Sequence, residues 1–300
     1  MKLNKLSNKQ QGILCIISAA FFFALMNLFV RLAGDLPFYE KSFFRNLVAL
    51  FVSFMTIKLS GEGFHVGKGN MKFLLCRAIG GTCGILCNFY AIDNLDISDA
   101  SMLNKLSPFF SMVFSIWVLK EKPKFKEWII VAVAFIGAMF VVKPSFDITR
   151  LPALIGLFGG IAAGFAYTFV RKLGSRGEKG SMIVFFFSCF STLATVPMML
   201  VHYEPISPYQ FAMLILAGGA ATGGQYSITA AYQKAPAKEI SVFDYSQVVF
   251  AAILGFFFLG QVADIYSYIG YVIIIGIAIV KWFMTNKENH KPELTEEKVH

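Results

Sequence analysis

Residues 97–119 read ISDASMLNKLSPFFSMVFSIWVL, and this stretch decides how the chain folds. It is apolar and long enough for a membrane-spanning helix, which needs about 20 residues, but a lysine and a proline interrupt its centre. A lysine at the bilayer centre costs about 2.5–3.5 kcal/mol on insertion scales. We therefore expect Lys105 to face a wet cavity or an anionic partner. Helical spacing places five residues on this face of the helix: Ser101, Asn104, Lys105, Pro108 and Ser111.

The same design recurs 140 residues later, between Glu239 and Leu259. There a carboxylate, Asp244, lies in a mostly apolar stretch of spanning length. We interpret the two stretches as helices that form the walls of one cavity. Three pairs of residues correspond at this shift: Ser101 and Ser241, Asn104 and Asp244, and Lys105 and Tyr245.

The composition places the chain among the all-α polytopic membrane proteins. Hydrophobic residues make up 56% of the 300 residues and charged residues only 15%. Lipid-facing helices need so much apolar surface, whereas a soluble core of this size does not. A charged tail, residues 285–300, is expected to be disordered. Ten segments have spanning length, namely residues 11–33, 39–59, 71–92, 97–119, 126–143, 152–173, 181–201, 208–232, 237–259 and 264–284.

The charge distribution predicts how the spans are oriented. Of the 27 lysines and arginines, 20 lie in the N-terminus and the alternate loops that follow it, and four lie on the other side. The remaining three, Arg45, Arg77 and Lys105, lie inside spans. The positive-inside rule then predicts a protein of the cell membrane with both termini in the cytoplasm. The rule also accounts for the net charge of +9, so no nucleic-acid partner is predicted.

An internal repeat relates the two halves of the chain without a gap. A shift of 140 residues places the FVR of residues 29–31 on the FVR of residues 169–171 and aligns the span boundaries. Because each unit has five spans, the second unit (residues 152–284) enters the membrane from the side opposite to the first (residues 11–143). Inverted repeats of this kind rock around a site at the midplane, so the pattern predicts alternating access.

Several motifs in the chain are those of a known transporter family. They are FVR near the end of the first span, RN early in the second and LSPFFSMVFSIWVLKEKP closing the fourth. With the two repeats, the chain resembles the EamA group of the drug/metabolite transporter superfamily from about Gln11 to Met284. The resemblance implies export or uptake of a small metabolite and names no substrate. The second repeat departs from the pattern, with Gln247-Val248 for Ser-Pro and Gln261 where Glu121 would map, so we expect the halves to differ in gating.

Charged residues inside the spans are candidate substrate-binding groups. Arg45 and Lys105 are expected about 9–12 Å below the outer surface of the membrane. Two cations at one depth would bind a carboxylate or a phosphate, the arginine as a bidentate fork and the lysine as a point charge. The alternative for Arg45 is that it reaches the interface, or pairs with Glu40 or Asp99.

Asp244 allows more than one interpretation. Unpaired, it would carry a coupling proton, and facing the substrate it would recognise an amine. The alternative is a structural ion pair with Lys105 or Arg77. Arg77 itself lies near the start of its span, so we expect it to extend to the interface. The remaining predicted substrate-binding residues are Asn27, Ser101, Asn104, Tyr167 and Tyr245.

The chain is predicted to be a secondary transporter and not an enzyme. All four histidines fall in loops or in the tail, and the spans hold no paired-acidic, His-Cys or Ser-His arrangement. No catalytic residue, metal site or cofactor is therefore predicted. The predicted partners are the bilayer and a small polar organic metabolite, amino-acid-like or otherwise carboxylate-bearing. The alternative is a membrane-embedded sensor or scaffold without transport activity.

Overall fold

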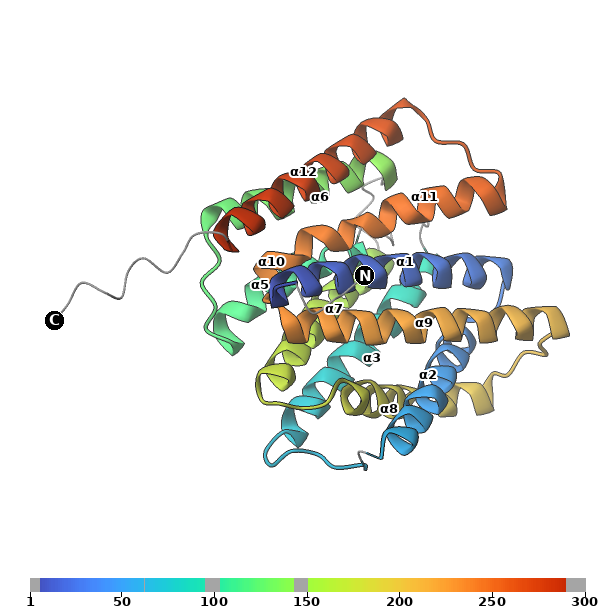
Figure 1. The fold of residues 1–300 in the computed structure, drawn as a ribbon. Coiled ribbons are helices and arrows are strands. Elements are labelled where there is room, and N and C mark those ends of the chain that lie inside the picture. The colour runs from blue at the N-terminus through green and yellow to red at the C-terminus, as the bar shows by residue number, and fades with distance from the viewer. Residues whose placement is uncertain (1–5, 62, 95–102, 143–150, 290–300) are drawn as a thin grey trace.

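The computed structural model describes residues 6–61, 63–94, 103–142 and 151–289, and these residues form helices joined by short loops (Figure 1). The helices of the first half are α1 (Asn8–Leu32), α2 (Phe38–Ser60), α3 (Met71–Asn94), α5 (Ser107–Val118) and α6 (Phe125–Val142). Those of the second half are α7 (Leu151–Ser175), α8 (Gly180–Val201), α9 (Pro208–Lys234), α10 (Ala237–Ile240), the 3₁₀-helix η2 (Ser241–Tyr245), α11 (Ser246–Leu259) and α12 (Ile265–Asn289).

These elements make up ten spans, as the sequence predicts. Eight described segments are long and apolar enough to cross a membrane, and one of them joins α10, η2 and α11 into residues 237–259. α5 is a shorter apolar helix of 12 residues and belongs to the fourth span. α9 is 27 residues long but less apolar, because glycine, threonine and glutamine interrupt its sequence.

The contacts between the halves follow a two-fold exchange. The 140-residue shift carries α1 onto α7, α3 onto α9 and α5 onto α11. α1 packs along α9 and α3 along α7, while α5 packs on α7 and α1 on α11. The pairs α2 with α8 and α6 with α12 map onto themselves (Figure 1). Each repeat is therefore completed by the other in an isologous arrangement, which confirms the prediction of two inverted five-helix repeats.

α1 and α9 show how local sequence sets the helix ends. Ser7 and Gln10 form a capping box at the start of α1, in which each side chain bonds the backbone N–H of the other residue. The same Ser-x-x-Gln box begins α9 at Ser207. At the far end of α9, the Lys234 Nζ lies 2.6 Å from the Gln11 Oε1, so the two helices run antiparallel.

Both termini lie at one end of the bundle, called the termini end below. The Gln10 side chain at the start of α1 donates to the Asn286 Oδ1 near the end of α12 at 2.9 Å. Glu239 of α10 joins the same cluster, 2.8 Å from the Lys281 Nζ. An even number of spans requires this placement. α12 continues to Asn289 with Thr285 fully buried, so the helix includes the first residues of the expected tail.

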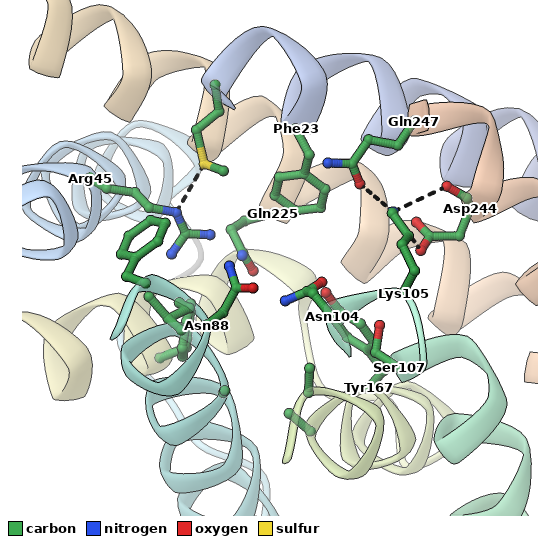
Figure 2. Close-up of a pocket in the computed structure, with 18 of the residues that line it drawn as sticks. Phe23, Arg45, Asn88, Asn104, Lys105, Ser107, Tyr167, Gln225, Asp244 and Gln247 are labelled. Atoms are coloured by element: carbon green, nitrogen blue, oxygen red, sulfur yellow. Dashed lines mark hydrogen bonds and ion pairs between the residues drawn. The ribbon is translucent and has the colours of Figure 1, made fainter. Parts of the chain in front are cut away.

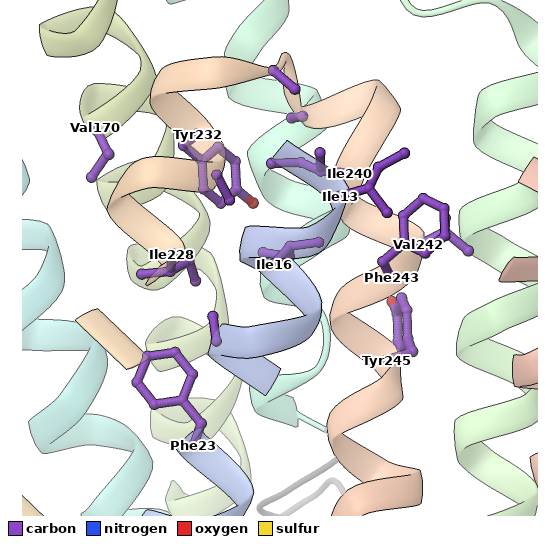
Figure 3. Packing of buried hydrophobic residues seen from close by; sticks show 14 of the residues in the cluster. Ile13, Ile16, Phe23, Val170, Ile228, Tyr232, Ile240, Val242, Phe243 and Tyr245 are labelled. Carbon is purple, nitrogen blue, oxygen red and sulfur yellow. The ribbon is translucent and has the colours of Figure 1, made fainter. Parts of the chain in front are cut away.

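Part of the buried apolar core packs around the first turns of α1, near the termini end, and Figure 3 shows its side chains. Ile13 and Ile16 of α1 meet Tyr232 of α9 and Ile240 of α10, and all four are at most 2% exposed. Lipid is as apolar as these side chains, so van der Waals packing holds the cluster together, with little hydrophobic driving force between helices. The cluster closes the bundle at this end.

Candidate functional site

A polar cavity of about 130 Å³ lies between the two repeats (Figure 2). Side chains from α1, α2, α3, α5, α7, α8, α9 and α11, together with η2 and the segment before α5, surround it. Its polar lining residues are Asn27, Arg45, Arg77, Asn88, Asn104, Lys105, Ser107, Tyr167, Gln225, Asp244 and Gln247.

Two helix breaks place charged side chains in this cavity. In the first repeat the backbone turns at Lys105 and Leu106, and α5 restarts at Ser107 with a proline in its first turn, where the missing N–H needs no partner. In the second repeat α10 gives way to η2, which ends at Tyr245 before α11 begins. Broken helices at the midplane of inverted repeats are typical of transporter binding sites.

Lys105 pairs with the second repeat across the cavity. Its Nζ lies 3.5 Å from the Asp244 Oδ2 and donates to the Gln247 Oε1 at 2.6 Å (Figure 2). Lys105 and Asp244 are each only 7% exposed. The Tyr245 hydroxyl donates in return to the backbone carbonyl of Lys105 at 3.0 Å. The structure thus contains the Lys105–Asp244 ion pair that the sequence left as an alternative.

Two buried guanidinium groups form another part of the lining. Arg45 is 5% exposed, and its Nη1 donates to the Asn46 Oδ1 at 3.2 Å. Arg77 is 2% exposed, donates from Nη2 to the Gln225 Oε1 at 3.0 Å, and lies over the Phe187 ring with Cζ 4.0 Å from the centroid. Neither arginine has a carboxylate partner among the described residues, and the Arg77 Nε has no hydrogen-bond partner there.

Asn46 orients Arg45 from behind. The Asn46 amide donates to the Ser42 carbonyl oxygen at 2.8 Å and to the Ser191 Oγ of α8 at 2.9 Å, which leaves its Oδ1 for Arg45. The Arg45 Nε faces the Met26 Sδ at 3.2 Å, a weak acceptor. Much of the hydrogen-bonding capacity of this guanidinium is therefore available to a ligand.

Six of the eight predicted substrate-binding residues line the cavity. Tyr245 does not, because it is fully buried in the apolar core and reaches Lys105 from behind. Ser101 lies outside the described residues. The residues that line the cavity as predicted are Asn27, Arg45, Asn104, Lys105, Tyr167 and Asp244.

One expectation about the arginines is wrong, and one alternative is not found. Arg77 does not extend to the interface, because α8 supplies Phe187 and α9 supplies Gln225 to hold its guanidinium inside the bundle. Arg45 does not pair with Glu40, whose Oε1 accepts instead from the Glu204 backbone N–H at 2.7 Å. Asp99, the other partner considered for Arg45, lies outside the described residues.

Two glutamines of the site were missed by sequence reasoning. Gln247 lies three residues after Asp244, so helical spacing puts both on one face. This spacing is a sequence signal that could have identified Gln247 as a residue of the site. Gln225 is an isolated amide in a long span, and nothing in its neighbourhood indicates that it reaches Arg77 from another repeat.

A second, larger chamber of about 590 Å³ adjoins the polar cavity and shares Asn27, Lys105 and Gln247 with it. The chamber lies between the last turns of α6, the length of α11 and the first turns of α12. Because these helix ends lie away from the termini, the chamber leads from the cavity toward the opposite end of the bundle.

The termini end is closed by an ion pair as well as by the apolar core. The Arg171 Nε lies 3.7 Å from the Glu121 Oε1, and the Arg171 Nη1 donates to the Gln233 carbonyl oxygen at 2.8 Å. Burial raises the pKa of Glu121, and the charges of Arg171 and Lys238 oppose this rise. As the pH falls, Glu121 is therefore protonated, and the ion pair lost, at a higher pH than for a carboxylate of ordinary pKa.

The inverted repeats, the broken spans and the polar cavity between the repeats define a multi-pass membrane transporter. The chain belongs to the EamA-like transporter family, whose model matches residues 10–143 and 150–282. This is a transporter family and not an enzyme family, as the sequence predicts.

The relatives of the chain are membrane proteins of similar length. The pseudopaline exporter CntI of Pseudomonas aeruginosa is 30% identical over 274 residues, covering 90% of this chain and 95% of the exporter. Human solute carrier family 35 member G1 is 26% identical, with 92% of this chain and 81% of that protein covered. The riboflavin transporter of Vibrio cholerae is 24% identical, with coverages of 94% and 96%. A solved crystal structure superposes with a TM-score of 0.81 at 12% identity, covering 93% of this chain and 99% of that one, and so has the same fold.

Proposed function

We propose that this transporter carries a small organic anion with at least one carboxylate. The observation that carries the proposal is the pair of buried arginines that line the cavity without a carboxylate partner in the described chain. With Lys105, three cations face a single lining carboxylate, Asp244. A buried charge without a counter-ion is costly, so the cavity is suited to a ligand that supplies negative charge. Arginine forks also match carboxylate geometry.

The Lys105–Asp244 pair gives the cavity a place for a substrate amine. Lys105 makes its shorter contact with Gln247, at 2.6 Å, and lies 3.5 Å from the Asp244 carboxylate. A ligand ammonium can approach Asp244 while Lys105 stays bonded to Gln247. An amino-acid-like substrate would then place its amine at Asp244 and its carboxylate at Arg45 or Arg77.

Transport is proposed to proceed by alternating access. The apolar core and the Glu121–Arg171 pair close the termini end, while the larger chamber leads toward the opposite end. Rocking of the two repeats about the cavity would open the termini end and close the opposite end. Protonation of Asp244 would remove its attraction for Lys105. In a proton-coupled cycle, the coupling proton would therefore bind at Asp244.

Uptake into vesicles that contain the purified full-length chain tests the proposal. We expect labelled carboxylates such as succinate and glutarate to be transported, and their uncharged diamides succinamide and glutaramide to be transported at least about tenfold more slowly, the effect of one lost charged hydrogen bond. Arg45→Gln and Arg77→Gln should each lower carboxylate transport, with exposed Arg31→Gln as the control. Runs with and without a pH gradient report on proton coupling.

Two results would contradict the proposal. Faster transport of the uncharged members of each pair would show that the arginines do not select anions. Lack of movement of any probe under every gradient, together with tight binding of a partner protein, would favour the sensor or scaffold alternative.

A further inference from the structure

We propose that the transported anion is amphipathic, with its charged head in the polar cavity and an apolar or aromatic body in the adjoining chamber. The inference rests on the proposed function, because it takes the cavity as the site of the anionic group. It adds a second binding compartment and narrows the class of substrate.

The two compartments are continuous at the charged end of the site. Lys105 and Gln247, which bond each other at 2.6 Å, line both spaces, and so does Asn27. A ligand whose head group reaches Lys105 therefore has its remaining atoms directed either deeper into the cavity or outward into the chamber. The cavity has only about 130 Å³ of space, whereas the chamber has about 590 Å³.

The chamber is lined chiefly by apolar side chains. Val249 and Ile253 of α11 form one wall, Val141 of α6 and Ile275 of α12 form another, and Ala252 lies among them. Its polar residues lie at its two ends: Asn27, Lys105 and Gln247 beside the cavity, and Gln261, Ser267, Tyr268 and Tyr271 where α11 ends and α12 begins. The walls between these two ends are apolar.

This distribution is better suited to an apolar ligand group than to the passage of a hydrophilic ion. An apolar wall offers a carboxylate or an amide no hydrogen bonds, but each apolar Å² that it covers on a ligand contributes about 25 cal/mol. The chamber volume falls within the range of about 300–1,000 Å³ that is typical of sites for drug-sized ligands. The walls therefore contribute affinity only if the ligand has an apolar body.

Binding of matched probes to the full-length chain in lipid nanodiscs tests the inference. Acetate is compared with phenylacetate, and alanine with phenylalanine, by the ligand-dependent shift of the unfolding temperature. We expect the aromatic member of each pair to bind at least about tenfold more tightly, the gain from covering about 60 Å² of apolar surface. Succinate and succinamide, measured beside them, report on the anion preference alone.

Two variants locate the effect in the chamber. Ala252→Trp fills the space and should reduce the aromatic preference to about twofold or less, while acetate binding is kept. Leu193→Trp, at a 65% exposed position of α8, is the matched control and should leave the preference unchanged. Ile253→Thr, which adds a hydroxyl without bulk, should lower the preference if Ala252→Trp fails to fold.

The outcomes separate this inference from the proposed function. Equal binding within each probe pair, with succinate still preferred over succinamide, would overturn the inference and leave the anion site standing. An aromatic preference that Ala252→Trp and Ile253→Thr leave unchanged would also overturn it. Loss of the preference for succinate would instead contradict the proposed function.

Discussion

Lys105 is held by two side chains of the second repeat that contribute in different ways. The Gln247 Oε1 supplies a short hydrogen bond at 2.6 Å, and the Asp244 carboxylate supplies the compensating charge at 3.5 Å. Both charged residues are almost completely buried. The intact ion pair therefore contributes little net stability, but removing one partner is costly because the other charge stays buried without a counter-ion.

Lys105→Met should destabilise the protein by about 3–5 kcal/mol, because it leaves the buried Asp244 without a counter-ion. The observed pairing sets this direction, because removal of a buried cation that had no partner would leave no charge uncompensated. The unfolding temperature of the purified variant in detergent provides the measurement.

The double variant Lys105→Met/Asp244→Asn provides the control, because it removes both charges. It should recover most of the stability that the single variant loses, while transport of carboxylates remains abolished in both. A single variant as stable as the parent protein would show that Asp244 is compensated by another group.

At the scale of elements, close packing of α7 against α5 brings the first helix break to the cavity. A Cβ atom at Gly164 of α7 would lie 2.8 Å from both the Ser107 carbonyl oxygen and the Ser111 backbone nitrogen. Both neighbours are backbone atoms, which cannot rotate away. Glycine at this position thus lets α7 reach the turn that carries Lys105, in the way small residues bring membrane helices together.

Gly164→Ala should therefore cost about 1–3 kcal/mol of stability, the range for overpacking a filled interior. Gly219→Ala is the matched control, since Gly219 is an exposed helical glycine of α9 where an added Cβ would meet no atom within 4 Å. The control should be neutral, or stabilising by up to about 1 kcal/mol through helix propensity. Thermal unfolding of the two variants side by side makes the comparison, and equal stabilities would contradict the packing argument.

The sequence was sufficient for the elements but not for the details of their breaks. Hydropathy and spacing predict ten spans, because a span must satisfy its own backbone hydrogen bonds whatever its neighbours are. The direction of a side chain at a break depends on the local backbone, and η2 turns Tyr245 into the core while Asp244 lines the cavity. Helical spacing alone could not separate these adjacent residues.

The lining of the candidate site was predictable for the residues that belong to the two broken, repeat-related spans. Asn104 and Asp244 lie at corresponding positions of the two broken spans, Lys105 follows Asn104 directly, and the structure brings all three to the cavity. Arg77 was misassigned because its environment comes from α8 and α9, which are distant in sequence. Position within a span indicates depth in the membrane but not which helices surround the residue.

At the scale of the whole molecule, the two repeats have the same backbone hydrogen bond after their fourth and ninth spans but differ in one ion pair. The backbone N–H of Glu121 donates to the Ser115 carbonyl oxygen at 3.2 Å, and that of Gln261 donates to the Gly255 carbonyl oxygen at 3.1 Å. These are corresponding positions of the two repeats. In the first repeat the Glu121 carboxylate also pairs with Arg171, and this pair closes the termini end. Gln261 has no charge with which to form the equivalent contact.

The residue that corresponds to Arg171 in the first half is Arg31, at the end of α1. Arg31 and Gln261 are both exposed, and Arg31 has no ion pair within the described part of the chain. The termini end thus has a charged closing contact that the opposite end lacks. In the proposed alternating-access cycle, this difference would favour the state in which the chamber beside the cavity is open, which is the kind of asymmetry in gating that the sequence predicts.

Gln261→Glu should install the missing contact by pairing with Arg31, and so shift the protein away from the state that is open at the chamber end. An exposed pair contributes only about 0–1 kcal/mol, which is enough to change the populations of two states of similar energy. The measurement is the rate at which a membrane-impermeant maleimide labels Ile253→Cys in the chamber, read by mass spectrometry of that peptide. Gln261→Glu should slow labelling, and adding Arg31→Gln should restore the original rate. Slowing that persists without Arg31 would show that the new carboxylate acts by another route.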